Sequence, residues 1–229
     1  MERTVIADAT GDRYNRRMNT TEELPLIICF GDSLTAGYQA PSRDNPAGQQ
    51  TPYGRFLEPL LRARARISVS GVCGEVTGEM VLRFRSDVLD RRPCYVVILG
   101  GTNDLGWNAS PQEIFRNLVK MYELARAAGI VAVPVTVPSL RISGGASQKG
   151  AVVLLGEQIS RRRILNGLIQ DYARSKGLPS VDLFSATSDP ASLQLCPEYS
   201  NDGLHLTTEG YRRLATLLHD EIFLAMPTT

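Results

Sequence analysis

The chain has 229 residues, of which 43% are hydrophobic and 21% are charged, a composition typical of a globular protein with one sizeable core. Its 25 lysines and arginines nearly balance its 24 aspartates and glutamates. This balance argues against nucleic acid or an anionic membrane surface as a partner, because both are bound through a strong excess of positive charge.

The first 23 residues carry charge throughout and lack the continuous apolar stretch of a secretory signal. No run in the chain approaches the roughly 18 apolar residues that a membrane span needs. We therefore expect 1–23 to be an N-terminal extension, poorly structured or packed on the surface, and 24–229 to be a single domain. The same observations predict a cytoplasmic protein without integral membrane association.

Cysteines and histidines are too scattered to suggest a metal site. The four cysteines show no C-x-x-C spacing, and the chain has only two histidines. Neither a zinc site nor a redox pair is therefore expected. The cysteines are Cys29, Cys73, Cys94 and Cys196.

Five apolar runs of strand length recur along the chain, rich in valine and isoleucine and without polar alternation. They lie at 24–30, 66–70, 95–100, 130–137 and 180–184. Such runs are typical of parallel strands that are covered on both faces. Helical spacing predicts helices between and after them, at 53–65, 77–90, 111–128, 157–176 and 208–225. The alternation predicts an α/β protein with a five-stranded parallel sheet and helices on both faces.

The helix at 111–128 has the clearest ends. Ser110 is a predicted N-cap, Pro111 suits the first helical position, and Glu113 completes a capping box. Gly129 is placed to end the helix.

The segment 139–156 is irregular, with a glycine-rich half followed by the apolar letters AVVLL. So apolar a stretch is not expected to be left in water without a purpose. It is interpreted either as a short extra strand or as a flap that lines a binding cleft.

Four polar turns follow predicted strands, three directly and the fourth after a longer loop beyond the last strand. Ligands of open parallel sheets bind beyond the carboxyl ends of the strands. Each turn alone also has a purely structural interpretation, because Gly, Asp and Ser are common in tight turns and helix caps. The turns are Gly31-Asp32-Ser33-Leu34, Gly71-Val72-Cys73-Gly74-Glu75, Gly101-Thr102-Asn103-Asp104 and Asp202-Gly203-Leu204-His205.

Together the turns contain every group that acyl transfer needs at one place. Ser33 is a candidate nucleophile, and His205 is a candidate base that would remove its proton. Asp202, three residues before the histidine, is close enough to orient the imidazole. The oxyanion could be bound by the backbone N–H groups of Ser33 and Gly74 and by the carboxamide of Asn103.

The order and spacing of these turns resemble the GDSL/SGNH hydrolases over 24–225. The four matching blocks read FGDSLTAGY, SGVCGEVTGEM, ILGGTNDL and NDGLHLTTEGY. The resemblance implies a three-layer α/β/α sandwich of flavodoxin-like character. It also implies that Ser33 is the nucleophile, His205 the general base and Asp202 its orienting residue, with Ser33, Gly74 and Asn103 as oxyanion donors. It implies no metal and no cofactor.

One block departs from the family pattern. Many relatives have Gly-Asp-Thr or Gly-Glu-Thr where this chain has Gly-Glu-Val-Thr, so Gly71 stays an alternative to Gly74 as the donor. Asp32 and Trp107 are candidates for contact with substrate, although Trp107 could equally be packed in its loop. His219, the other histidine, lies far along the last predicted helix and is expected on the surface.

The expected activity is hydrolysis of small to medium acyl esters through an acyl-enzyme intermediate, with a small-molecule ester as substrate. A lysophospholipase or acyl thioesterase and a carbohydrate O-deacetylase are alternatives within the same family. A different class is a flavodoxin-like binding module whose GDSLT turn cradles a phosphate at a helix N-terminus. That alternative leaves Asp202 and His205 unexplained.

Overall fold

The structure is a computed structural model that describes residues 24–42, 45–142 and 149–224. The expected extension at 1–23 lies outside the described residues, so the expected division of the chain stays a prediction. The strands are β1 (Leu26–Gly31), β2 (Tyr38–Gln39), β3 (Gln49–Gln50), β4 (Arg66–Gly71), β5 (Tyr95–Leu99) and β6 (Val131–Pro134). The α-helices are α1 (Ser33–Ala36), α2 (Tyr53–Leu60), α3 (Thr77–Asp87), α4 (Thr102–Gly106), α5 (Pro111–Ala127), α6 (Lys149–Lys176), α7 (Leu183–Thr187) and α8 (Thr208–Leu218). Short helical turns are η1 (Leu89–Arg91), η2 (Pro197–Tyr199) and η3 (His219–Phe223).

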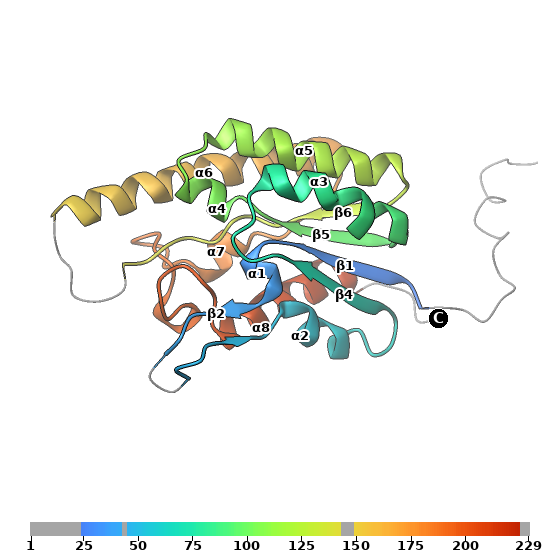
Figure 1. Cartoon of the computed structure of the whole chain (residues 1–229), viewed down its shortest axis with the longest axis horizontal. Coiled ribbons are helices and arrows are strands. Elements are labelled where there is room, and N and C mark those ends of the chain that lie inside the picture. The colour runs from blue at the N-terminus through green and yellow to red at the C-terminus, as the bar shows by residue number, and fades with distance from the viewer. Residues whose placement is uncertain (1–23, 43–44, 143–148, 225–229) are drawn as a thin grey trace, which may run out of the picture.

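A parallel sheet with the strand order β4-β1-β5-β6 forms the middle layer of the molecule. Figure 1 shows α3, α5 and α6 on one side of this sheet and α2 and α8 on the other. Strands β2 and β3 form a separate antiparallel pair. The predicted α/β class and the layered arrangement are confirmed.

Strand β1 shows why the predicted strands are continuously apolar. Ile27 and Cys29 belong to the hydrophobic core under α2 and α8, whereas Ile28 and Phe30 belong to the core under α3, α5 and α6. All four side chains are fully buried. Because successive residues of a strand point to opposite faces, a sheet covered on both sides needs apolar residues at every position.

The prediction of a fifth strand at 180–184 is wrong. Only Val181 pairs in parallel fashion, through a single bridge to Val135. The next residue, Asp182, is the N-cap of α7 and accepts hydrogen bonds from Ser185 N at 3.1 Å and from Thr136 Oγ1 at 2.9 Å. This cap turns the chain into a helix where a strand would have to continue.

The apolar letters AVVLL do not form the extra strand that was one of the two expectations. They belong to the first turns of α6, which begins at Lys149 rather than at the predicted 157. Figure 1 shows this end of α6 extending past the edge of the sheet. Val152, Val153 and Leu154 are exposed there. Residues 143–148 of the glycine-rich half lie outside the described residues.

The predicted helix 111–128 is confirmed as α5. Ser110 Oγ accepts a hydrogen bond from Glu113 N at 3.2 Å, and Pro111 is the first helical residue. Gly129 follows the helix with φ +73°.

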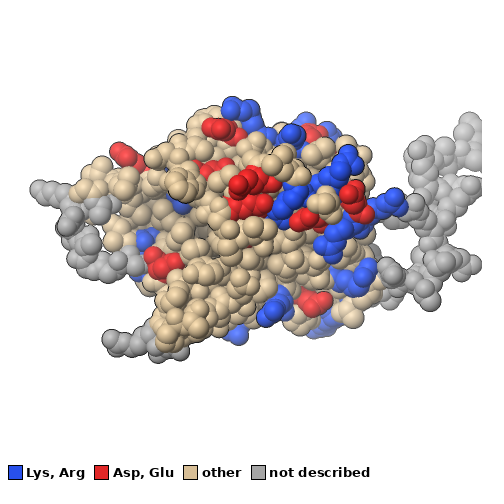
Figure 2. All heavy atoms as spheres, in the orientation of Figure 1, with Lys and Arg blue, Asp and Glu red and all other residues tan. Residues whose placement is uncertain are grey.

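Charged side chains of both signs are interspersed on the face shown in Figure 2, as the near-zero net charge of the chain would lead one to expect. Within the described ranges, no helix has the length and apolar character needed to cross a membrane.

The register of the sheet brings three strand ends to one level. Gly31 at the end of β1 lies opposite Gly71 of β4 and opposite Leu99 of β5. The turns that carry Ser33, Gly74 and Asn103 therefore begin side by side, at the edge where α1 and α4 lie in Figure 1.

Close approach of β4 to α1 requires a glycine at position 71. A Cβ atom on Gly71 would lie 2.2 Å from the backbone nitrogen of Ala36. We expect Gly71→Ala to lower the free energy of unfolding by about 1–3 kcal/mol, since overpacking against backbone forces it to shift. Urea denaturation measures this change.

Gly167→Ala is the matched control, because a Cβ atom at this position of α6 would meet nothing within 4 Å. We expect this variant to be neutral or stabilised by up to about 1 kcal/mol. Equal effects of the two substitutions would contradict the close contact between β4 and α1.

Candidate active site

Ser33 is the first residue of α1, directly after β1. Asp32 is the N-cap of this helix, and its Oδ1 accepts a hydrogen bond from Leu34 N at 2.9 Å. The backbone oxygen of Asp32 also accepts from Ala36 N at 2.9 Å. The turn that was interpreted as structural therefore holds the Ser33 hydroxyl at the carboxyl edge of the sheet, where 5% of the residue is exposed.

Asp32 is fully buried, and its Oδ2 has no hydrogen-bond partner. Burial raises the pKa of this carboxyl to about 7, against the lowering effect of the Leu34 N–H. Asp104 and Glu75 also contribute to raising this pKa and His205 to lowering it, so charges from the other three turns act on this carboxyl. Asp32 is buried as a helix cap, and its expected contact with substrate stays a prediction.

Asp202 and His205 form a hydrogen-bonded pair, with 2.7 Å between His205 Nδ1 and Asp202 Oδ2. Asp202 Oδ1 accepts from the backbone N–H of Leu204 at 2.9 Å and of His205 at 2.8 Å. Partial burial opposes ionisation, but the His205 ring and these N–H groups together lower the pKa of Asp202 to about 2. An ionised carboxylate only accepts, so His205 Nδ1 must donate and its Nε2 is left as a proton acceptor.

Tyr38 packs edge-on against the His205 ring, with 4.6 Å between the ring centroids. Its backbone oxygen accepts a hydrogen bond from Tyr211 Oη of α8 at 2.7 Å. Next to it, Gln39 Nε2 donates to Thr208 Oγ1 at 2.9 Å. The β2 segment therefore fixes His205 from the side, a role whose only sequence signal is the place of Tyr38 at the end of the FGDSLTAGY block.

Ser33 and His205 make no hydrogen bond to each other within the described part of the chain. Catalytic hydrogen bonds are often long in substrate-free enzymes and shorten when substrate binds.

Gly74 and Gly71 occupy different environments. Gly74 has φ +81°, and a Cβ atom there would meet nothing within 4 Å, so its backbone is open to approach. Gly71 is paired in β4 and pressed against α1. Of the two glycines, Gly74 has the geometry of an accessible N–H donor.

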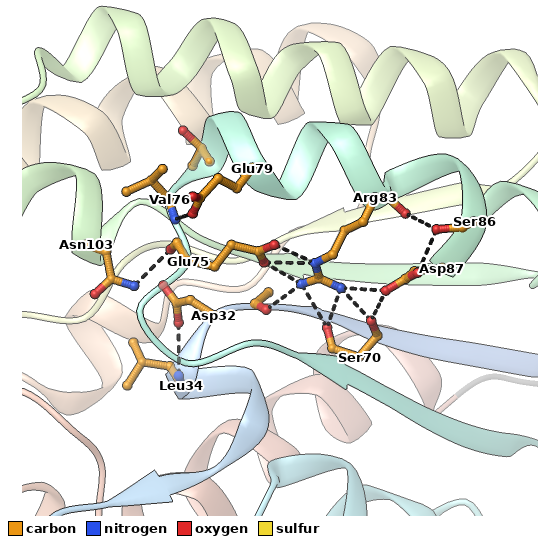
Figure 3. A network of polar contacts seen from close by, with 12 residues as sticks. Asp32, Leu34, Ser70, Glu75, Val76, Glu79, Arg83, Ser86, Asp87 and Asn103 are labelled. Atoms are coloured by element: carbon orange, nitrogen blue, oxygen red, sulfur yellow. Dashed lines mark hydrogen bonds and ion pairs between the residues drawn. The ribbon is translucent and has the colours of Figure 1, made fainter.

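Hydrogen bonds join the turns after β4 and β5. Asn103 Nδ2 donates one hydrogen bond to the backbone oxygen of Glu75 at 2.9 Å, as Figure 3 shows, which leaves its second N–H free. The buried Asp104 carboxylate accepts from Thr77 N at 2.9 Å and from Thr77 Oγ1 at 2.6 Å. These contacts fix the position of Asn103 relative to Gly74.

A partly buried ion pair stabilises the turn after β4. Arg83 of α3 donates to Glu75 through Nε at 2.7 Å and through Nη2 at 2.6 Å (Figure 3). The guanidinium also donates to the backbone oxygen of Gly31 at 2.9 Å and lies 4.2 Å from the centroid of the Phe30 ring. Sequence reasoning missed this pair, because nothing local marks Glu75 and Arg83 as partners.

A cleft of about 490 Å³ lies beside these turns, between α4, the first turns of α6, the segment after β6 and the Asp202 turn. Trp107 borders it and is 80% exposed, so this side chain is not packed in its loop. Ser33, Gly74 and His205 are not among the residues that line the cleft. Its lining includes Asn103, Trp107, Arg141, Leu155, Arg162 and Asp202.

His219 lies apart from this site. Its Nδ1 is 2.6 Å from Asp220 Oδ1, and it borders a separate pocket with Leu60 and Leu224. His205 is therefore the histidine that the fold brings to the carboxyl edge of the sheet.

Arg83→Met should lower the free energy of unfolding by about 3 kcal/mol, because it leaves the 7%-exposed Glu75 carboxylate without its cation. Urea denaturation at neutral pH measures the loss. Arg85→Met is the control on the same helix: that side chain is 79% exposed, and its pair with Asp90 spans 4.0 Å. We expect the control to change stability by less than about 0.5 kcal/mol, and an Arg83 variant equally mild would contradict the supporting role of the pair.

Asp32→Asn should stabilise the protein at pH 7.5 and not at pH 3.5. The folded-state pKa of Asp32 is about 7 and its ordinary value is 3.8, so between these values the unfolded chain ionises while the folded chain resists ionisation. Stability is therefore lost as pH rises through this window, and the asparagine, whose amide oxygen can still accept from Leu34 N, avoids the loss.

We expect a gain of at least about 1 kcal/mol at pH 7.5 in urea denaturation. Asp90→Asn, at a mostly exposed position, is the control and should change little at either pH. A gain from Asp32→Asn that is the same at both pH values would show that the buried charge is not its origin.

Comparison with solved structures gives the same fold. The lipase/acylhydrolase from Enterococcus faecalis superposes with a TM-score of 0.71 at 24% sequence identity, over 90% of this chain and 99% of that one. Est24, a carbohydrate acetylesterase from Sinorhizobium meliloti, gives a TM-score of 0.67 at 19% identity, over 86% and 98% of the two chains.

Sequence comparison gives the family. The "Uncharacterized lipoprotein YqeF" of Bacillus subtilis (strain 168) is 34% identical over 170 residues, which are 68% of this chain and 69% of that protein. Because that relative is named a lipoprotein, the cytoplasmic location expected for this chain stays a prediction. The model of the GDSL-like Lipase/Acylhydrolase family matches residues 29–213, from the middle of β1 into α8. With the fold, the four turns and this match in agreement, the chain belongs to the GDSL-like lipase/acylhydrolase family.

Proposed function

We propose that this protein is a serine carboxylester hydrolase that cleaves small to medium acyl esters through an acyl-enzyme intermediate. The observation that carries the proposal is the 2.7 Å hydrogen bond between Asp202 and His205. The charge of His205 also acts on the carboxyl of Asp32, which is the N-cap of the helix that begins at Ser33. The ionised Asp202 holds the imidazole in the tautomer that a general base requires.

In this mechanism His205 Nε2 takes the proton from the Ser33 hydroxyl as the serine oxygen attacks the ester carbonyl. The C–O bond to the alcohol then breaks, and the imidazolium returns the proton to the leaving oxygen. Water then gives a proton to His205 and attacks the acyl carbonyl; the bond between the acyl carbon and the serine oxygen breaks, the imidazolium returns the proton to that oxygen, and the acid leaves. No metal or cofactor takes part in these steps.

Three donors would bind the oxyanion of each tetrahedral intermediate: the N–H groups of Ser33 and Gly74 and the free N–H of Asn103. The open backbone of Gly74 and the fixed carboxamide of Asn103 support this assignment. One such donor lowers a barrier by about 2.7–4 kcal/mol in the well-studied case of subtilisin.

A carbohydrate O-deacetylase is the second candidate within the same chemistry. The exposed indole of Trp107 at the cleft offers a flat apolar face with a polar edge, which suits a sugar ring. The likeness to Est24, whose name describes a carbohydrate acetylesterase, points the same way. A lysophospholipase or thioesterase would need a long apolar channel, whereas this cleft also contains arginine and aspartate side chains.

A binding module without catalysis is the alternative from another class. It would give the fully oriented Asp202–His205 pair no purpose. A fluorophosphonate probe separates the two classes, because it modifies an activated serine and leaves an ordinary turn serine untouched.

Ser33→Ala should lower kcat for p-nitrophenyl acetate or butyrate at least about 1,000-fold and abolish labelling by the fluorophosphonate. Far-UV circular dichroism should not change. Ser175→Ala, on the exposed end of α6, is the control and should retain both activity and labelling. Full activity in the Ser33 variant would falsify the assignment.

A further inference from the structure

Arg162 is a buried cation that has no counter-ion among the described residues. The residue is 2% exposed, and its Nη1 donates only to Gln158, at 3.1 Å to Oε1 and at 3.3 Å to the backbone oxygen. Its Nε is buried and has no partner. Among the described residues no carboxylate bonds to this guanidinium, whereas Arg83 and Arg126 each pair with one. The buried guanidinium therefore lacks a partner of opposite charge within the described part of the chain.

Burial and, to a lesser degree, the neighbouring charge of Arg161 together lower the pKa of Arg162 to about 10. A group with this pKa still carries its proton at neutral pH. Arginine suits a buried ion pair, because its planar guanidinium can bind a carboxylate or phosphate through two parallel N–H groups.

A second arginine borders the same cleft. Arg141 follows β6, and one of its Nη atoms donates to the backbone oxygen of Ser200. Its Nε is also buried without a partner. No acidic side chain pairs with Arg141 within the described ranges, so two cations face one cavity and neither is neutralised there.

The acid that lines this cleft does not serve as their counter-ion. Among the described residues that line the cleft, Asp202 is the only carboxylate. Its oxygens accept from the His205 ring, from two backbone N–H groups and from Ser200 Oγ. The cleft also contains Asn103, a proposed oxyanion donor. A molecule held by the two arginines would therefore lie next to the groups that carry out the proposed reaction.

We propose that the ester substrate carries an oxyanion, a carboxylate or a phosphate group, which binds in this cleft to Arg162 and Arg141. This inference rests on the proposed ester hydrolysis and names its substrate class. The unpartnered Nε of Arg162 forms one edge of the guanidinium together with Nη2, and that edge matches the two oxygens of a carboxylate or phosphate. The anion would supply the negative charge that no described residue provides to the buried arginine.

Matched pairs of esters test the proposal. p-Nitrophenyl hydrogen adipate and p-nitrophenyl hexanoate differ by a charge on the acyl side, and 4-acetoxybenzoate and 4-acetoxybenzamide differ by a charge on the alcohol side. 4-Acetoxyphenyl phosphate distinguishes phosphate from carboxylate. We expect the anionic member of at least one comparison to have a kcat/KM at least about tenfold higher than its neutral partner. Equal kcat/KM in all comparisons would overturn the proposal.

Variants of α6 identify the residue responsible. Arg162→Met keeps the size of the side chain and should lower the ratio of anionic to neutral kcat/KM at least about tenfold, to near one. Arg162→Lys keeps the charge without the planar fork and should retain part of the preference. Arg163→Met, which removes an exposed cation from the next position, should leave the ratio unchanged. An unchanged ratio in Arg162→Met would contradict the assignment whatever its stability, because a ratio cancels any loss of folded protein.

A binding measurement separates this proposal from the proposed hydrolysis. Trp107 is the only tryptophan of the chain and borders the cleft, so its fluorescence reports occupancy without turnover. In Ser33→Ala protein, adipate or phenyl phosphate should change this fluorescence saturably and hexanamide should not. Adding Arg162→Met to this variant should raise the Kd of the anion at least about tenfold. If the protein binds anions but the wild type hydrolyses no ester, the anion site is supported and the proposed hydrolysis is wrong. If no anion changes the fluorescence, the proposed anion site is wrong.

Discussion

The parallel pairing of β1 with β4 and β5 places Gly31, Gly71 and Leu99 at one level of the sheet, and the proposed nucleophile and oxyanion donors depend on that register. Ser33, Gly74 and Asn103 come only a few residues after these three ends, so they meet without any long loop. A shift of one residue in either pairing would turn the side chains of a strand to the opposite face and separate the turns. The glycine at position 71 lets β4 approach α1 closely enough to keep this level edge.

Acidic groups that repel one another lie close together at the carboxyl edge of the sheet. Contacts with other residues offset part of this repulsion. Asp32, Glu75 and Asp104 are all buried near the ends of β1, β4 and β5. Arg83 neutralises Glu75, and the N–H and hydroxyl groups of Thr77 solvate Asp104. Burial raises the pKa of Asp32, because the single N–H group that it receives only partly offsets the loss of water and its other oxygen has no partner. A site that holds such a group loses stability for the sake of its geometry.

The cleft has the opposite electrostatic imbalance. Arg162 and Arg141 face it without acidic partners in the described part of the chain, while the one acid in its lining is committed to His205. Two cations in a lining that also contains Asn103 and Asp202 give the cleft a polarity that a purely apolar acyl chain would not need. Substrate preference in this fold is therefore expected to depend on the segments that border the cleft, while the chemistry depends on the sheet edge.

Features decided by neighbouring residues could be predicted from the sequence alone. Continuous apolar runs identified four strands of the sheet, caps and periodicity identified α5, and the three-residue spacing of Asp202 and His205 was enough to predict their hydrogen bond. Contacts between distant residues could not be predicted in this way. Thr136 and the helix cap at Asp182 reduce the expected fifth strand to one bridge. Arg83 of α3 pairs with Glu75 in the preceding turn. Tyr38 packs on His205, which lies far away in the sequence. The letters RRR at 161–163 look alike in sequence, but only the packing of α6 buries Arg162 and leaves Arg163 exposed, because burial is a property of the assembled layers.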